Sequence, residues 1–290
     1  MIAGLVLLGG GVAAGVFGSL LGLGGGILIV PLLTLGFGLP LREAVAISLV
    51  SVIVTSSASA AVYLQRHVAN LRLGMTLELF SALGALVGGL VAFLISERVL
   101  AGLFAALMTW VAISMARRKD PPKVAASASE PVAIDSVATA PEHLIDVAPV
   151  PAVTDPSFAA ALSGPGYRIH RLPAGMIGSV FAGLNSALLG VGGGIIKVPV
   201  MHLVMGVPLR TSTATSNMMM GITATASAVI YLLRDEIDPF VAGPICLGVF
   251  IGASAGSRLA HRVDVRILRW LFVIVLIYTA FQMAMRALGL

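Results

Sequence analysis

The sequence predicts an all-α polytopic membrane protein with two inverted-topology repeats, each having five apolar segments and a short, glycine-broken helix near the midplane. Three observations support this fold class. The composition is 58% hydrophobic and only 11% charged over 290 residues. A glycine-rich motif and the segment after it occur twice at a constant offset of 168 residues. Equivalent loops of the two copies also carry exchanged charge.

The repeat is defined by the motif Gly-x-Gly-Gly-Gly-Ile-x-x-Val-Pro, which spans 22–31 and returns at 190–199. Residues 22–66 and 190–234 share 21 identities in 45 aligned positions, more than a common apolar composition explains. A duplicated membrane unit with a broken segment is typical of transporters, in which the substrate site lies between the repeats.

The composition also excludes several classes of protein. So small a charged fraction is unlike that of a soluble domain. The single cysteine, Cys246, rules out a disulfide within the chain and argues against a cysteine-built metal site. No phosphate-binding loop, metal cluster or nucleophile motif occurs, so we expect no enzyme, no cofactor and no metal. The net charge of +5 does not indicate nucleic-acid binding, because the basic residues lie at the ends of apolar runs.

The apolar segments divide evenly between the two halves. In the first half they cover 2–20, 26–38, 42–65, 71–95 and 97–116, and in the second half 172–189, 194–206, 211–233, 239–257 and 267–286. A full crossing needs about 20 apolar residues. The segments 26–38 and 194–206 are shorter, follow three glycines and contain a proline, so we expect half-helices or re-entrant elements there. Because no Lys or Arg precedes Arg42, the first segment is expected to belong to the mature fold rather than to a signal peptide.

The two membrane repeats, 1–118 and 171–290, are joined by a stretch of different composition at 119–170. This stretch is rich in Pro, Ala, Val and Ser and has no helical or alternating apolar pattern. The sequence therefore predicts a flexible linker.

Loop charges predict the orientation. Basic residues enter and leave the linker, which places it in the cytoplasm. The basic loop at 66–72 corresponds to the acidic loop at 234–238, and the nearly neutral loop at 96–98 corresponds to the very basic 258–269. Such exchange is expected of homologous units inserted in opposite directions. Both termini are then extracytoplasmic, whether the first two segments of each half both cross or form a re-entrant hairpin.

The glycine runs are the first candidate site. Three consecutive glycines are unfavourable inside a helix but allow the chain to turn and expose backbone N–H groups, which attract anions. The candidate anion-binding residues are Gly24, Gly25, Gly26, Gly192, Gly193 and Gly194. Close helix packing through small residues is the alternative explanation, but the recurrence of glycines and proline together favours a broken helix.

Polar side chains inside apolar segments are the second candidate site. Lys197 replaces the Ile29 of the first copy and is expected to face a cavity or a partner, with snorkelling to the interface as the alternative. Ser48 and Ser216 are equivalent in the repeat, and Asn217 follows the second serine. Hydroxyl and amide groups can hold an oxyanion, although many such residues only link helices.

Glu78 is the one carboxylate well inside an apolar segment. It is a candidate coupling residue that carries protons, or a structural partner for a loop arginine. We favour the structural role.

The paired glycine motif, followed each time by Pro-Leu-Arg and a helix rich in Ser and Thr, resembles the sulfite exporter TauE/SafE family. The similarity covers about 1–118 and 172–290 but not the linker. The resemblance implies a secondary transporter of small sulfur-containing anions, such as sulfite, sulfonates or sulfoacetate, in the inner (plasma) membrane of a bacterium.

The residues and the resemblance together predict an anion carrier that works by alternating access and exports its substrate. The membrane potential favours anion export by about 2.3 kcal/mol per charge at 100 mV, whereas import would require coupling to H⁺ or Na⁺. The sequence specifies neither the coupling ion nor an oligomeric state. The alternatives are a passive anion channel and a membrane scaffold or sensor that acts through its linker.

Overall fold

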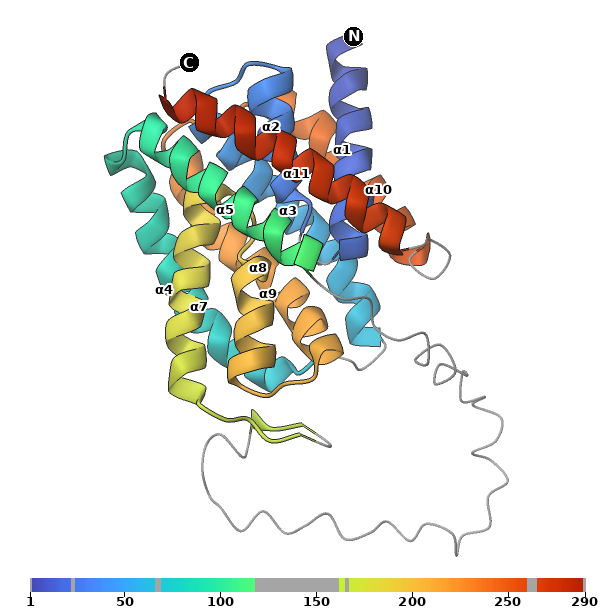
Figure 1. Cartoon of the computed structure of the whole chain (residues 1–290), viewed down its shortest axis with the longest axis vertical. Helices are drawn as coiled ribbons and strands as arrows, with labels where there is room; N and C mark the ends of the chain where they lie inside the picture. Colours follow the sequence, from blue (N-terminus) through green and yellow to red (C-terminus); the bar gives the residue numbers. More distant parts are fainter. Residues whose placement is uncertain are drawn as a thin grey trace, which may run out of the picture.

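The computed structural model describes residues 2–21, 24–65, 69–117, 162–164, 167–259 and 265–288, and within them it contains ten α-helices and two π-helical turns (Figure 1). The helices of the first half are α1 (Ile2–Leu21), α2 (Gly26–Pro31), α3 (Leu41–Gln65), α4 (Leu71–Leu94) and α5 (Glu97–Arg117). Those of the second half are α7 (Leu172–Leu189), α8 (Gly194–Pro199), α9 (Leu209–Leu232), α10 (Pro239–Leu259) and α11 (Val265–Leu288). The ten predicted segments are thus confirmed as helical, with ends shifted by a few residues.

Some predictions lie outside the described residues. The linker predicted at 119–170 is described only at 162–164 and 167–170. Gly22 of the first motif and the loop residues Arg66, His67, His261 and Arg262 are also outside.

The short segments are broken helices, as predicted. Gly24 and Gly25 have φ angles of 76° and 73°, and Gly192 and Gly193 have 76° and 70°, which only glycine adopts without strain. Each short helix begins directly after these turns and continues beyond its proline as a π-helical turn, Leu32–Gly36 and Val200–Val204. We call each short helix together with its π-helical turn an arm, 26–36 in the first half and 194–204 in the second. The eleven residues of an arm rise about 16 Å, roughly half the thickness of the hydrocarbon core, so neither arm spans the membrane.

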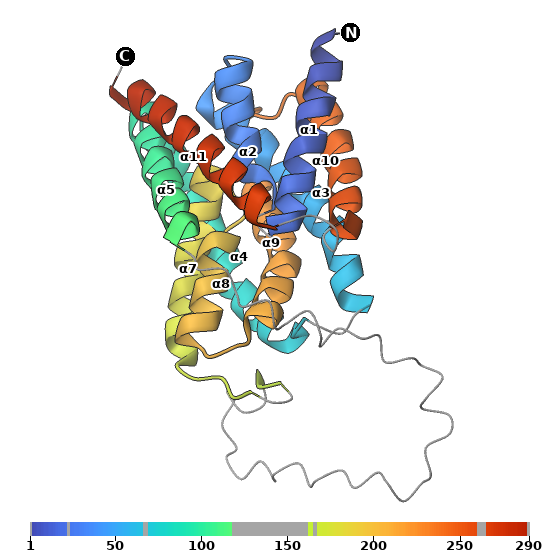
Figure 2. The same cartoon turned by 45° about the vertical axis from the view of Figure 1, so that its right-hand side comes forward.

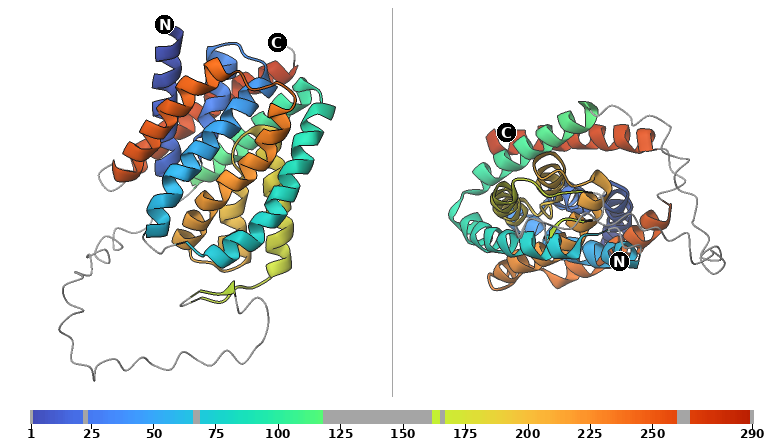
Figure 3. Two further views of the ribbon diagram at one scale, coloured as in Figure 1. Left: turned by 180° about the vertical axis from the view of Figure 1, so that it is seen from behind. Right: turned by 90° about the horizontal axis from the view of Figure 1, so that it is seen from below.

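The two halves enter the bundle from opposite ends. α1 and α2 form a hairpin that starts and finishes at the end where both chain termini lie, whereas the α7–α8 hairpin starts and finishes at the other end (Figures 1 and 2). α3 and α9 pack against each other between the hairpins. α5 and α11 pack side by side along one outer side of the bundle (Figure 3).

Each hairpin packs against a long helix of the other half. α1 lies along α10, and α7 lies along α4. These two contacts are equivalent under the offset of 168 residues. A β-carbon added at Gly183 would overlap the carbonyl oxygen of Ser81, and one added at the equivalent Gly15 would lie 2.5 Å from the carbonyl oxygen of Val249, the equivalent of Ser81. Small residues therefore allow the backbones to touch, as in other membrane helix pairs.

The surface of the bundle fits a lipid environment. Among the described residues, five helices contain stretches long and apolar enough to cross a membrane, in α3, α4, α5, α7 and α10. Large apolar side chains are exposed along the outward faces of α4, α10 and α11. The chain is therefore a polytopic membrane protein.

The glycine contacts yield a prediction about stability. Gly183→Ala should lower the thermal unfolding midpoint in detergent, because the new methyl group overlaps backbone atoms of α4 that cannot move freely, at a cost of about 1–3 kcal/mol. Gly9→Ala in α1 is the control, because no atom of another element lies within 4 Å of its added β-carbon and the helix gains stability from Ala. An unchanged midpoint in Gly183→Ala would contradict the close packing of α7 on α4.

Candidate functional site: the meeting point of the two broken helices

The two glycine turns meet in the middle of the bundle. A β-carbon at Gly26 would overlap the carbonyl oxygen of Gly190, and the Ser48 hydroxyl donates to this same oxygen over 2.7 Å. Ser48 Oγ also lies 3.2 Å from the carbonyl oxygen of Gly26. Residues from the first glycine run, the second glycine run and α3 therefore share one small region.

Two apolar side chains fill the space between the turns. A β-carbon added at Gly192 would lie 2.9 Å from Val52 Cγ1 and 3.1 Å from Met220 Sδ. Met220 Sδ would also lie 3.3 Å from a β-carbon at Gly24. Val52 and Met220 are themselves equivalent in the repeat. In this conformation the centre of the bundle is therefore closed by packed side chains.

Ser216 differs from its counterpart Ser48. Its hydroxyl is completely buried and has no hydrogen-bond partner among the described residues. It lies beside Gly194, whose added β-carbon would be 3.4 Å from Ser216 Oγ. A buried hydroxyl without a partner costs about 1–3 kcal/mol. This group is therefore available to a ligand that enters between the arms.

Asn217 is also buried, with 4% of its surface exposed. Within the described part of the chain no hydrogen bond joins its side-chain amide to another residue. Its backbone carbonyl accepts a hydrogen bond from the Ser56 hydroxyl, which in turn accepts one from the Gly221 N–H over 2.9 Å. The carbonyl of Asn217 and the N–H of Gly221 would pair directly in a regular helix, so Ser56 of α3 bridges one step of the α9 backbone.

Lys197 lies one turn beyond the second glycine run and is buried, with 1% of its surface exposed. Snorkelling is therefore excluded. Its Nζ atom donates to Glu78 Oε2 over 3.0 Å and to Thr223 Oγ1 over 2.6 Å. The Thr223 hydroxyl in turn donates to Glu78 Oε1. The three side chains, which we call the ion-pair triad, join α8, α4 and α9.

The triad changes the interpretation of two predicted residues. The sequence favours a loop arginine as the partner of Glu78; the structure corrects this, because the partner is Lys197 of the opposite half. Lys197, which the sequence predicts to face a cavity or a partner, has such a partner, and its charge is therefore compensated in this conformation. Thr223 was not predicted. One sequence signal could have linked the two charges: Lys197 stands opposite Ile29 and Glu78 opposite Cys246, so both charges break the repeat.

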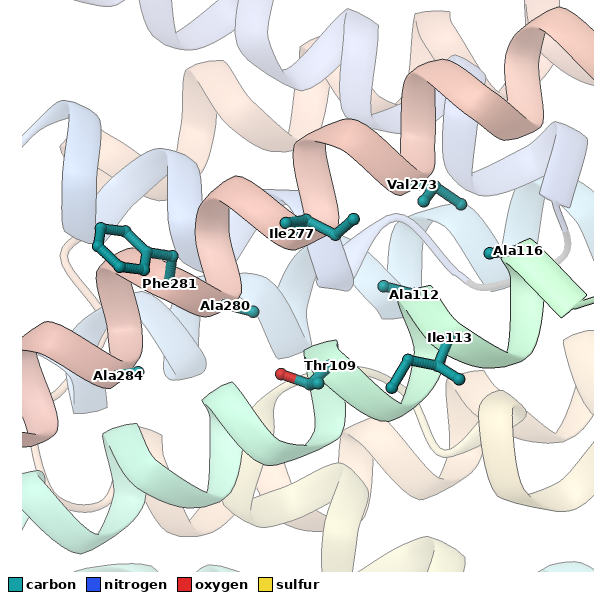
Figure 4. Close-up of a pocket in the computed structure, with 9 residues that line it drawn as sticks. All are labelled: Thr109, Ala112, Ile113, Ala116, Val273, Ile277, Ala280, Phe281 and Ala284. Atoms are coloured by element: carbon teal, nitrogen blue, oxygen red, sulfur yellow. The ribbon is translucent and has the colours of Figure 1, made fainter.

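Two larger cavities lie away from this region. One of about 340 Å³ separates α5 from α11 and is apolar except for Thr109 (Figure 4). Another of about 430 Å³ lies beside α1 and α2 and is lined by Leu28, Phe17 and Val275, among others. Neither cavity is lined by Ser48, Ser216, Asn217 or a residue of the triad. Neither is lined by a charged side chain that could bind an anion.

The triad yields a prediction with a matched control. Thr223→Val keeps the shape of the side chain but removes one partner each from Lys197 and Glu78, so it should destabilise the protein by about 1–3 kcal/mol. The control Thr55→Val alters the equivalent threonine, whose hydroxyl donates over 2.8 Å to the carbonyl of Ser51 in its own helix. Thermal unfolding in detergent should show the larger loss for Thr223→Val. Equal losses would argue against the triad.

Comparison with known proteins agrees with this architecture. The chain is similar to YunE, a probable membrane transporter of Bacillus subtilis, with 23% identity over 94% of both chains. It is also similar to MJ0441, a probable membrane transporter of Methanocaldococcus jannaschii, with 25% identity over 89% of this chain and 85% of the relative. A third relative is MamO, a probable membrane transporter of Paramagnetospirillum magneticum. The match to MamO has 28% identity and covers 97% of this chain but only 44% of MamO. No solved structure matches the chain.

The family model for the sulfite exporter TauE/SafE matches residues 7–283, which include both glycine turns, the ion-pair triad and all the described helices of both halves in whole or in part. This match extends over nearly the whole chain and agrees with the transporter names of the relatives. The protein is therefore a membrane transporter and not an enzyme, and it belongs to the sulfite exporter TauE/SafE family.

Proposed function

We propose that this transporter exports a small sulfur-containing anion, such as sulfite, a sulfonate or sulfoacetate, by alternating access. The observation that carries the proposal is the meeting of two glycine-turn helix starts beside the buried Ser216 hydroxyl, which has no hydrogen-bond partner among the described residues; the next residue, Asn217, is also buried. Helix starts supply N–H donors and partial positive charge, and the two side chains add neutral donors. Such groups suit a tetrahedral or pyramidal oxyanion.

In this proposal the substrate-binding residues are those of both glycine runs together with Ser48, Ser216, Asn217 and Lys197. Val52 and Met220 must withdraw before an anion can enter, since they occupy the space between the turns. The Ser56 hydroxyl bonds both the Asn217 carbonyl and the Gly221 N–H, and it thereby joins α3 to α9 beside the proposed site.

We infer that the repeats, 1–118 and 171–290, have inverted topology with the linker 119–170 in the cytoplasm and both termini outside. The opposite entry of the two hairpins supports this arrangement (Figure 1). In a bacterial inner membrane an anion concentration that is higher in the cytoplasm than outside would then drive export. The charged loops set the orientation through the excess of Lys and Arg on the cytoplasmic side.

The two arms differ in how tightly they pack, which supports a carrier with two states. The cavity of about 430 Å³ beside α2 includes Phe17, Leu28 and Val275. The residues equivalent to these three, Asn185, Ile196 and Leu107, line a space of only about 10 Å³ beside α8. In a transporter of inverted repeats, exchange of these two packings would move access from one side of the membrane to the other.

The transport activity can be tested with purified protein in liposomes. Unlabelled sulfite on the inside should accelerate the uptake of ³⁵S-sulfite, because a carrier exchanges substrate faster than it returns empty. A passive channel would show no such acceleration. Protein-free liposomes are the control and should show no acceleration. If internal sulfite does not accelerate uptake in liposomes that contain the protein, the protein is not a sulfite carrier.

The site can be tested by binding. Ser216→Ala and Asn217→Ala should each weaken sulfite binding roughly 10–100-fold, because each removes one donor to a charged ligand, about 1.5–3 kcal/mol. Ser216→Ala should bind more weakly without a lower unfolding midpoint, since its hydroxyl has no partner among the described residues to lose. The exposed Ser57, changed to Ala, is the matched control and should bind normally. Normal binding in both site variants would refute this site.

A further inference from the structure

The ion-pair triad holds two full charges away from water with no net charge. Lys197 and Glu78 are 1% and 4% exposed, and Thr223 is fully buried. Thr223 accepts from the ammonium group and donates to the carboxylate, so it fixes both charges in one geometry. A buried pair with such partners tolerates burial far better than either charge alone.

The positions equivalent to the triad under the repeat hold a neutral set of residues. Under the offset of 168 residues, Lys197 corresponds to Ile29, Glu78 to Cys246 and Thr223 to Thr55. The threonine is present in both copies, whereas both charges occur in one and neither in the other. A fold that accepts the neutral set does not need the ion pair for its architecture, which points to a role in activity.

The pair lies on the route from the glycine turns. Ser216, Met220 and Thr223 occupy positions i, i+4 and i+7 of α9 and therefore share one face. Gly194 and Lys197 are three residues apart on α8, and both contact this face, Gly194 through Met220 and Lys197 through Thr223. An anion beside Ser216 and Gly194 therefore has Lys197 as the nearest cation along the same stripe.

The charge balance decides what happens when that anion arrives. A monoanion added to the paired Lys197 and Glu78 leaves one uncompensated negative charge inside the membrane, which is strongly unfavourable. A single proton on the Glu78 carboxylate removes this excess. The ammonium group can then leave the carboxyl group and bind the anion, and the site is neutral again.

We propose that Glu78 is the proton-coupling group of this transporter and that Lys197 pairs with Glu78 when the site is empty and with the substrate anion when it is loaded. On loading, one O–H bond forms on Glu78 with a proton from the same side as the anion, and the ion pair separates. On release, the proton and the anion leave together and the pair forms again. This inference rests on the proposed function.

The groups around Glu78 fit this role. α7 and α9 pack against α4, and α8 reaches Glu78 through Lys197. α7 carries no charged or titratable residue between Leu172 and Leu189. Apart from the triad, the charged or titratable residues on α4, α9 and the π-helical turn after α8 are Arg72, His202, Arg210 and Tyr231. Among those with described side chains, none forms an ion pair with Glu78.

The transport of the proton and that of the anion are coupled if the site can be sealed from water and change its access only when its net charge is zero. The empty ion pair and the loaded site with protonated Glu78 are both neutral, so both can change access. A site with anion but no proton, or with proton but no anion, carries a net charge and is held back. Transport of a monoanion is then electroneutral, and the gradients of anion and proton together set its direction, so accumulation of the anion inside favours export.

The experiment uses the full chain in liposomes with equal pH on both sides, potassium and valinomycin to set the potential, and no sodium. Electroneutral transport predicts the same final distribution of ³⁵S-sulfite at zero potential and at 100 mV. Uncoupled movement of a single charge predicts a ratio that changes roughly 50-fold. A distribution in the wild-type protein that follows the potential would overturn the proposal.

Glu78→Gln separates net transport from exchange. The variant should retain acceleration by internal sulfite, because the loaded site is neutral, but lose net efflux at least about tenfold, because its empty site keeps the uncompensated Lys197 charge. Glu97→Gln, at an exposed carboxylate at the start of α5, is the matched control for net efflux. Net efflux by a folded Glu78→Gln equal to that of the wild type would also overturn the proposal.

A second variant covers the case in which Glu78→Gln does not fold. Lys197→Ile combined with Glu78→Cys introduces the neutral residues found at the equivalent positions of the repeat and should fold, but sulfite exchange should fall at least about tenfold because no cation remains for the anion. Potential-independent sulfite transport by this double variant would refute the role of the pair. If the wild type itself shows no exchange, the proposed function fails rather than the coupling.

Discussion

The contact between each hairpin and the long helix of the other half is the constraint on which the rest of the molecule depends. In a lipid environment no hydrophobic force draws helices together, so close packing through small residues must hold them. The glycines at Gly15 and Gly183 let α1 and α7 touch the backbones of α10 and α4. These contacts anchor the hairpins deep in the opposite half. The broken ends of both arms therefore reach the same central region.

The duplicated frame supports chemistry that is not duplicated. The Ser48 hydroxyl donates a hydrogen bond to the backbone of the second glycine turn. The Ser216 hydroxyl has no hydrogen-bond partner among the described residues. The Ser56 bridge involves Asn217 and Gly221, which replace the Leu49 and Ile53 of the first half. The ion-pair triad likewise occurs once. The second half thus supplies most of the polar groups, while the first supplies Ser56 and Glu78 that complete them.

Much of the fold could be predicted because it depends on patterns within one stretch of chain. Apolar length located the helices, and consecutive glycines before Ile27 and Ile195 located the turns. The pairing of Lys197 with Glu78 could not be obtained this way, since 119 positions separate them and a local pattern carries no information about which helices touch. The unused Ser216 hydroxyl was equally hidden, because its sequence neighbourhood resembles that of the satisfied Ser48.

The division of the ion pair between two halves constrains the order in which its charges could arise. A lysine acquired first would place an ammonium group beside a cysteine, where nothing compensates it. A glutamate acquired first can remain a neutral, protonated acid that donates to Thr223. A neutral set of residues at these positions could therefore gain the acid at little cost and the lysine afterwards. Natural variants of this fold that keep a lone acid at this place should then be tolerated, whereas those with a lone lysine should be rare.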